Sequence, residues 1–211
     1  MAESKSYQNQ IQEPQEASAI ISTPRLILRD LTAADAPALF RYRSMPEVTK
    51  FQGWTPVATE DAVRFVEKEI CHVMDQPDTW FQLGIFLRDG QILIGDMGLH
   101  FLGAGDSGEG NPRASDTVEI GITVAPDFQG KGFAAEAVGH GLKFLFEELG
   151  KEKVVASVDP LNEKSMDLMK RVGFHLEGIH KDACLFRGRW TDDAVFSMTR
   201  KQWKKTPKPS A

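Results

Sequence analysis

The chain has 211 residues, 41% of them apolar, which is enough for one domain with a hydrophobic core. Its 25 lysines and arginines are outnumbered by 30 aspartates and glutamates, and a net charge of −5 argues against nucleic-acid binding by bulk electrostatics. The two cysteines, Cys71 and Cys184, and the five histidines lack the spacing of a disulfide scaffold or a metal site, so no metal is expected. Because neither an apolar leader nor a run of about 18 apolar residues occurs, we expect a cytoplasmic protein without a membrane segment.

The order of predicted elements favours a single α/β (α+β) domain. Residues 1–19 and 205–211 are polar and are expected to be disordered tails around a domain over residues 20–204. Hydrophobic periodicity and turn residues predict strands over 25–29, 80–87, 91–102, 117–124, 153–158, 174–180 and 194–199, and helices from Thr32 through Phe40, over 59–74, from the turn at Gly132 to Leu149 and over 163–172. Interleaved strands and helices with hairpins at both ends predict a mixed central sheet flanked by helices.

A glycine-rich polar loop over residues 103–116 is expected to be mobile near the active site. Its acidic residues Asp106, Glu109 and Asp116 are interpreted as a solvated cluster. A second interpretation is that they attract a cationic acceptor.

The strand over 117–124 carries a carboxylate beside a glycine. Alternate residues of a strand share a face, so Val118, Ile120, Ile122 and Val124 form an apolar face. Glu119 and Gly121 lie on the opposite face, where the missing side chain of Gly121 leaves room for a ligand against the strand. Glu119 is therefore a candidate catalytic group, and its alternative role is a strand carboxylate paired with a lysine or arginine.

The turn that follows this strand is a candidate anion site. Glycines direct main-chain N–H groups toward one point, and the start of the next helix adds its positive dipole end. The residues of this turn are Gln129, Gly130, Lys131, Gly132, Phe133 and Ala134. The turn matches neither the P-loop pattern nor the dinucleotide-binding fingerprint. Its alternative interpretation is a tight loop with a solvated lysine.

Four motifs in order carry a family resemblance. Gln129-x-x-Gly132-x-Ala134, after Val124, resembles the Q/R-x-x-G-x-G/A signature of the GNAT superfamily of N-acetyltransferases. The other three resemble the opening strand, second motif and closing strand of the RimJ/RimL-like branch, typified by ribosomal-protein N-terminal acetyltransferases. They are Thr23-x-Arg25-Leu-Ile-Leu-Arg29, Asn162-x-x-Ser165 followed by Val172-Gly-Phe174 and Glu177-Gly178, and Met198-Thr-Arg-x-x-Trp203. The resemblance covers residues 20–204.

The resemblance implies a sheet that is splayed between the parallel strands 117–124 and 153–158, with acetyl-CoA in the gap. The main chain of Ile122, Thr123 and Val124 would bind the pantetheine arm as an added strand does. The amides from Gln129 to Ala134 would hold the pyrophosphate. Asn162 and Ser165 would lie near the pantetheine and the thiol.

Transfer of an acetyl group to an amine requires a base, an oxyanion site and a proton for the leaving thiolate. Glu119 is the expected base, and a main-chain N–H near Thr123 or Val124 is the expected oxyanion donor. Many members of the superfamily use a tyrosine as the acid, four residues before the Gly-Phe pair, but this chain has Met169 there. Ser165 is the substitute that we name, and capping or packing of the helix is its alternative role. The thiolate can also leave without an acid.

The predicted activity is transfer of the acetyl group of acetyl-CoA to a primary amine by direct attack in a ternary complex. The resemblance implies either a protein N-terminus or a small amine as acceptor, with Trp54 as a candidate for its site. We expect a monomer or a homodimer. The alternative is a non-catalytic sensor or scaffold that binds coenzyme A with the same fold, with Met169 as the mark of lost chemistry.

Overall fold

The computed structural model describes residues 19–103 and 116–208. Residues 1–18 of the predicted N-terminal tail, 209–211 of the predicted C-terminal tail and 104–115 of the glycine-rich loop, including Asp106 and Glu109, lie outside the described residues. No helix within the described residues is long and apolar enough to cross a membrane.

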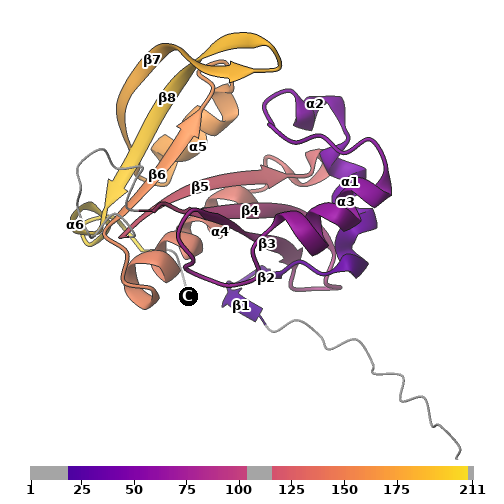
Figure 1. Ribbon diagram of the computed structural model, residues 1–211. Helices are drawn as coiled ribbons and strands as arrows, with labels where there is room; N and C mark the ends of the chain where they lie inside the picture. Colours follow the sequence, from indigo (N-terminus) through magenta and orange to yellow (C-terminus); the bar gives the residue numbers. More distant parts are fainter. Residues whose placement is uncertain (1–18, 104–115, 209–211) are drawn as a thin grey trace, which may run out of the picture.

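The elements alternate along the chain as the sequence predicts (Figure 1). The strands are β1 (Ala19–Ser22), β2 (Leu26–Asp30), β3 (Thr79–Leu87), β4 (Leu93–Phe101), β5 (Thr117–Val124), β6 (Lys153–Val158), β7 (His175–Phe186) and β8 (Arg189–Thr199). The helices are α1 (Ala36–Arg43), α2 (Pro46–Thr49), α3 (Thr59–Arg64), α4 (Phe133–Lys143), α5 (Glu163–Arg171) and α6 (Arg200–Trp203). α3 continues into a π-helical turn over Phe65–Glu69, and α4 into another over Phe144–Glu148.

The eight described strands form one mixed sheet in the order β1-β2-β3-β4-β5-β6-β8-β7. β5 and β6 are parallel and neighbouring strands elsewhere in the sheet are antiparallel. The β5–β6 register has only three pairs, from Thr117 opposite Lys153 to Glu119 opposite Val155. Beyond Glu119 the two strands separate, which confirms the predicted splayed sheet.

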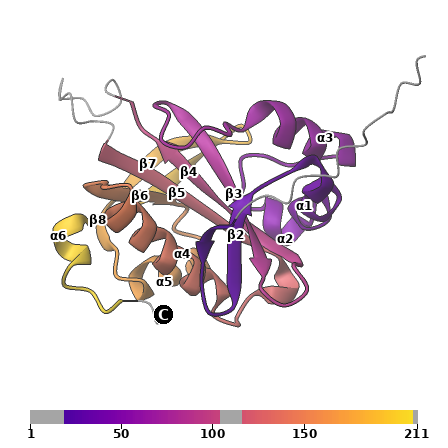
Figure 2. The ribbon, with the colours of Figure 1, turned by 90° about the horizontal axis from the view of Figure 1, so that it is seen from below.

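Two clusters of buried side chains hold the sheet and helices together. In the larger cluster, Ala137, Val138 and Leu142 of α4 pack with apolar residues of β2 to β6 and β8. In the smaller cluster, α1 and the α3 segment pack around Phe86 and Leu93. Figure 2 shows α4 and α5 beside each other and away from α1 and α3. This arrangement leaves the splay of β5 and β6 between the two groups of helices.

The helix predicted over 59–74 ends earlier than its apolar spacing suggests. Ile70 is extended (φ −88°, ψ 150°), and the Cys71 N–H donates to the Trp80 carbonyl oxygen at 2.8 Å. Val73, the last residue of the predicted apolar stripe, is 61% exposed. The correction has a simple cause, because pairing with β3 satisfies the main chain after Ile70 better than another helical turn would.

The C-terminal hairpin is longer than predicted, and the closing segment is not all strand. β7 extends to Phe186 and β8 begins at Arg189, around a turn at Gly188. β8 ends at Thr199, whose side chain caps α6, so the predicted closing motif finishes in a helix. Trp203 of α6 is buried against Phe146, with 5.9 Å between ring centroids.

Two further short elements among the described residues were not predicted. β1 begins at Ala19, at the boundary assigned to the N-terminal tail, and pairs with β2. α2 follows α1 after Met45. Their lengths give little periodicity from which a sequence could predict them.

Candidate active site

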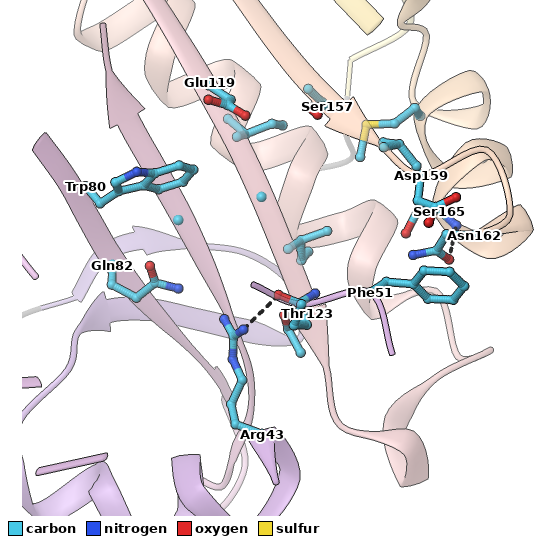
Figure 3. Close-up of a pocket in the computed structure, with 18 residues that line it drawn as sticks. Arg43, Phe51, Trp80, Gln82, Glu119, Thr123, Ser157, Asp159, Asn162 and Ser165 are labelled. Carbon is cyan, nitrogen blue, oxygen red and sulfur yellow. Dashed lines mark hydrogen bonds between the residues drawn. The ribbon is translucent and has the colours of Figure 1, made fainter. Parts of the chain in front are cut away.

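A cavity of about 250 Å³ lies where β5 and β6 separate (Figure 3). Its walls come from both strands, from the start of α5, and from residues of the α1–α2 region, β3 and β4. The lining residues that the sequence predicted are Glu119, Ile122, Thr123, Asn162 and Ser165, with Met169 beside them. The gap between the strands is therefore open to a ligand at the place the resemblance implied.

The main chain of β5 turns alternate residues toward this gap. The Ala125 N–H donates to Ile94 of β4, and Leu102 donates to the Thr117 carbonyl, so odd-numbered residues bond with β4. By alternation, Ile122 and Val124 direct their main-chain groups to the β6 side. Thr123 does not share this orientation, because its carbonyl oxygen lies against Gly95 of β4.

Glu119 lies at the inner end of the splay, in its last pair with β6. Its side chain is 29% exposed, and its Oε2 lies 3.4 Å from Nδ1 of His100, the residue directly opposite on β4. His100 in turn stacks on Trp80 of β3, with 4.7 Å between ring centroids and an interplanar angle of 9°. The three side chains thus form a row across β3, β4 and β5, with the carboxylate at the cavity.

The turn before α4 has the backbone that an anion cradle requires. Gly130 and Gly132 have φ angles of 72° and 82°, and Gly132 is the N-cap of α4. A Cβ on Gly130 would meet nothing within 4 Å, so the space over the turn is open. The Gln129 side chain fixes the turn to β5 by donating to the Val124 carbonyl at 2.9 Å. Lys164 of α5 donates to the same side chain at 3.0 Å.

The opening motif of the chain supports this turn from behind. Arg25 donates to the Lys131 carbonyl at 3.0 Å and, through Nε, to Glu136 at 2.6 Å. Thr23 donates to the same carboxylate, and so does the Arg25 main chain. Burial alone would raise the pKa of Glu136, but these hydrogen bonds outweigh it and lower the pKa below its ordinary value. We call Thr23, Arg25 and Glu136 the clamp.

Asn162 and Ser165 occupy the first turn of α5. The Asn162 side chain accepts from the Ser165 main-chain N–H at 3.3 Å, so Asn162 is the N-cap of the helix. Both residues line the cavity, as does the buried Met169. The predicted alternative of a capping role therefore describes Asn162, and the Ser165 hydroxyl stays a candidate acid.

A buried polar network that the sequence did not predict lies at the far end of the cavity. Asp96 of β4 has no exposed surface and accepts from Arg43 Nε at 3.0 Å. Arg43 Nη2, the Tyr42 hydroxyl and the Gln82 amide also donate to this carboxylate. Burial and the charge of Asp96 raise the pKa of Tyr42 well above its ordinary value, so its hydroxyl stays protonated.

Arg43 also reaches the loop after α2. Its Nη1 donates to Gln52 Oε1 at 2.8 Å, and the two side chains line the cavity with Gln82. No local motif marked Arg43, Gln82 or His100, because each joins the site through packing or strand register. Within the described residues, no cluster of three or more histidines, cysteines or acidic residues could hold a metal ion.

Comparisons with known proteins agree with this geometry. The model of the "Acetyltransferase (GNAT) domain" family matches residues 25–175. The uncharacterized N-acetyltransferase YnaD of Bacillus subtilis is 30% identical over 184 residues, 87% of this chain and 98% of that one. The [ribosomal protein uS5]-alanine N-acetyltransferase of Escherichia coli is 31% identical over 84 residues, 40% of this chain and 43% of that one.

Solved structures give the same result. A GNAT-family acetyltransferase from Bacillus anthracis superposes with a TM-score of 0.72 and is 26% identical, covering 86% of this chain and 98% of that one. A probable acetyltransferase from Chromobacterium violaceum shares the fold, with a TM-score of 0.73 at 22% identity and coverage of 97% and 98%. The splayed sheet, the glycine turn and the family match lead to one conclusion: this chain belongs to the GNAT family of acetyl-CoA-dependent N-acetyltransferases.

Proposed function

We propose that this enzyme acetylates a primary amine by direct attack within a ternary complex, with Glu119 as the base. The observation that carries the proposal is the position of Glu119, whose carboxylate lines the cavity at the point where β5 and β6 part. An amine bound in this cavity would lie within reach of the Glu119 carboxylate, which can accept its proton. The amine would also lie next to the gap between β5 and β6, where we expect the thioester to bind.

The described residues fit coenzyme A in three respects. Ile122 and Val124 turn main-chain groups toward the gap, which suits the amides of a pantetheine arm. Gly121, exposed and without a side chain, leaves the strand surface open. The turn from Gln129 to Ala134 offers main-chain N–H groups and the start of α4 to a pyrophosphate. Bound there, the coenzyme would supply an acetyl thioester as the electrophile.

The residues of the site suggest how the protein would assist each proton transfer. Most of a lysine-like amine is protonated at neutral pH, because its pKa is ~10.4. Glu119 removes that proton, directly or through one water molecule, and His100 orients its carboxylate. The N–H of Val124 faces the gap and is our candidate donor to the developing oxyanion. Ser165 is the proposed donor to the leaving thiolate, which is stable enough to depart without it because a thiol pKa is ~8.5.

The test of the base is Glu119→Gln. We expect kcat/KM to fall by about 100-fold at pH 7 and to recover partly at alkaline pH, where more of the amine is already deprotonated. The measurement is thiol release from acetyl-CoA as a function of pH. Glu177→Gln is the matched control, because Glu177 is a strand carboxylate paired with Lys153 at 3.0 Å and does not line the cavity. An unchanged pH profile in Glu119→Gln would remove this residue from the mechanism.

The same assay decides between the enzyme and a non-catalytic binding protein. A binding protein would take up acetyl-CoA without releasing thiol in the presence of any amine in a panel of peptides, polyamines and aminoglycosides. Thiol release with any one of these amines would support the interpretation that the protein is an enzyme. Acetyl-CoA is the proposed acetyl donor. We expect the protein to work in the cytoplasm.

A further inference from the structure

A second cavity, of about 450 Å³, adjoins the first. The two share four lining residues: Arg43, Gln52, Trp80 and Gln82. The first cavity contains Glu119, and the second extends from it toward the α2–α3 loop and the π-helical turn after α3. A volume of this size is typical of pockets that enclose a small organic group.

The second cavity has mostly apolar walls. Trp54 and Phe65 stack with 4.3 Å between ring centroids, and Ile70 and Trp80 complete the apolar lining. Trp80 is 40% exposed although it rests on His100, so its ring is available to a ligand. The ring can lie over the sheet because Gly98, the diagonal neighbour on β4 two residues before its partner His100, has no side chain, and a Cβ there would come within 2.9 Å of the Trp80 ring.

The charges of this cavity disfavour a second ammonium group. Among the described residues that line it, Arg43 and Glu69 are charged. Glu69 already pairs with Arg64 at 3.1 Å, and Arg43 is held by Asp96. The Arg43 guanidinium also lies 6.0 Å from the Trp54 ring centroid, which places a cation over the aromatic wall that a ligand cation would otherwise occupy.

We infer that the second cavity binds the non-reacting part of the acceptor, and that this part is apolar, with an aromatic ring or a branched chain next to the amine. The inference rests on the proposed function, because it places the amine at Glu119 and the apolar body between Trp54 and Trp80. Gln52 and Gln82 at the boundary suit one hydrogen-bonding group close to the amine. A polyamine, with a cation at each end, fits this arrangement poorly.

The experiment compares three acceptors that carry a primary amine: 2-phenylethylamine, a tripeptide that begins with phenylalanine, and spermidine. We expect the KM of one or both phenyl-bearing acceptors to be about tenfold or more below that of spermidine, as burial of one ring would give. A lower KM for 2-phenylethylamine than for the tripeptide would indicate a small amine as the acceptor. A lower KM for the tripeptide would indicate a protein N-terminus. A lower KM for spermidine would overturn the inference.

Two variants test the cavity itself. Trp54→Ala should raise the KM of the preferred phenyl-bearing acceptor about tenfold, with little change in kcat or in the KM of acetyl-CoA. Phe65→Leu, which removes a ring but keeps an apolar side chain, should also raise this KM. Trp190→Ala is the matched control, since Trp190 is 62% exposed and lines neither cavity. If both cavity variants keep the wild-type preference, the inference is wrong.

Calorimetry with 2-phenylethylamine and coenzyme A separates this inference from the proposed function. If no amine is acetylated but 2-phenylethylamine binds and Trp54→Ala weakens that binding, the cavity assignment holds while the proposed catalysis fails. If acetylation proceeds but spermidine is preferred, the catalysis holds and the cavity assignment fails. Absence of both turnover and binding overturns both.

Discussion

Asp96 shows how a charge can be accommodated at the floor of an active site. It is fully buried, and three neighbouring side chains, Tyr42, Arg43 and Gln82, donate to it. Two of these, Arg43 and Gln82, also form walls of both cavities. A buried ion pair adds little stability over an apolar core, but it fixes the direction of the groups that it holds. We therefore propose Asp96 as a positioning residue for the walls of the two cavities.

Asp96→Asn should lower the free energy of unfolding by about 3 kcal/mol, because it leaves the Arg43 charge buried without its partner. Urea denaturation measures this loss. Asp89→Asn, in the exposed turn between β3 and β4, is the matched control and should change stability by less than about 0.5 kcal/mol. A loss as small as that of the control would show that the network is solvated in solution.

The turn between β5 and α4 is the element on which we propose that coenzyme binding depends. Its shape comes from left-handed glycines, and the Gln129 side chain holds it to β5. Such a turn recognises a ligand by main-chain direction, which explains why its sequence signal is a spacing of glycines.

Gly132→Val should abolish measurable coenzyme A binding in calorimetry. Valine disfavours the φ of 82°, and its Cβ would come within 3.3 Å of Arg25 Nη2. Gly188→Val is the control, because Gly188 has a similar φ of 75° at the tip of the β7–β8 hairpin and open space around it. Both variants carry the backbone strain, of about 1–3 kcal/mol, but only the first should lose the ligand. Binding retained in Gly132→Val would contradict the cradle.

Elements that face the core were predictable, and those that face solvent were not. β5 and β6 have the predicted bounds, because burial of one face imposes strict alternation of apolar residues. The outer half of the β7–β8 hairpin is mostly exposed and contains Asp182 and Arg187 with positive φ, so its sequence carries no such pattern. Hydrogen bonding between strands, rather than side-chain periodicity, defines it.

The same distinction applies to the site. Glu119 and the glycine turn lie within one short stretch of sequence, and their local pattern predicted their position. His100 and Trp80 join Glu119 only through the register of β3, β4 and β5, which a single sequence does not specify. Arg43 reaches the cavity through helix packing, which is equally non-local.

At the scale of the whole molecule, the clamp joins distant parts of the chain. Glu136 lies 111 residues after Arg25, and their contact ties the start of β2 to the first turn of α4. Because the Glu136 side chain is only 12% exposed and accepts several hydrogen bonds, these contacts contribute to global stability and not only to local order.

Glu136→Gln should destabilise the protein by about 2 kcal/mol at pH 7, through loss of charge-assisted hydrogen bonds. A carboxyl whose pKa is lowered by folding contributes stability above its unfolded pKa, and that contribution is lost as the pH falls through the folded pKa. The difference in unfolding free energy between wild type and variant should therefore shrink below about pH 4. Glu148→Gln, an exposed control after α4, should show no such dependence. A difference that is constant with pH would refute this account.

The second cavity draws its walls from residues that precede β4, whereas most of the residues that line only the first cavity lie between Glu119 and Met169. Arg43, Trp54 and Gln82 all precede β4, whereas the splay and the glycine turn lie between Glu119 and Ser165. We therefore propose that acceptor preference and coenzyme binding depend largely on different stretches of the sequence. Replacements at Trp54 or Phe65, which line only the second cavity, are therefore expected to change which amine binds while the acetyl donor is held unchanged.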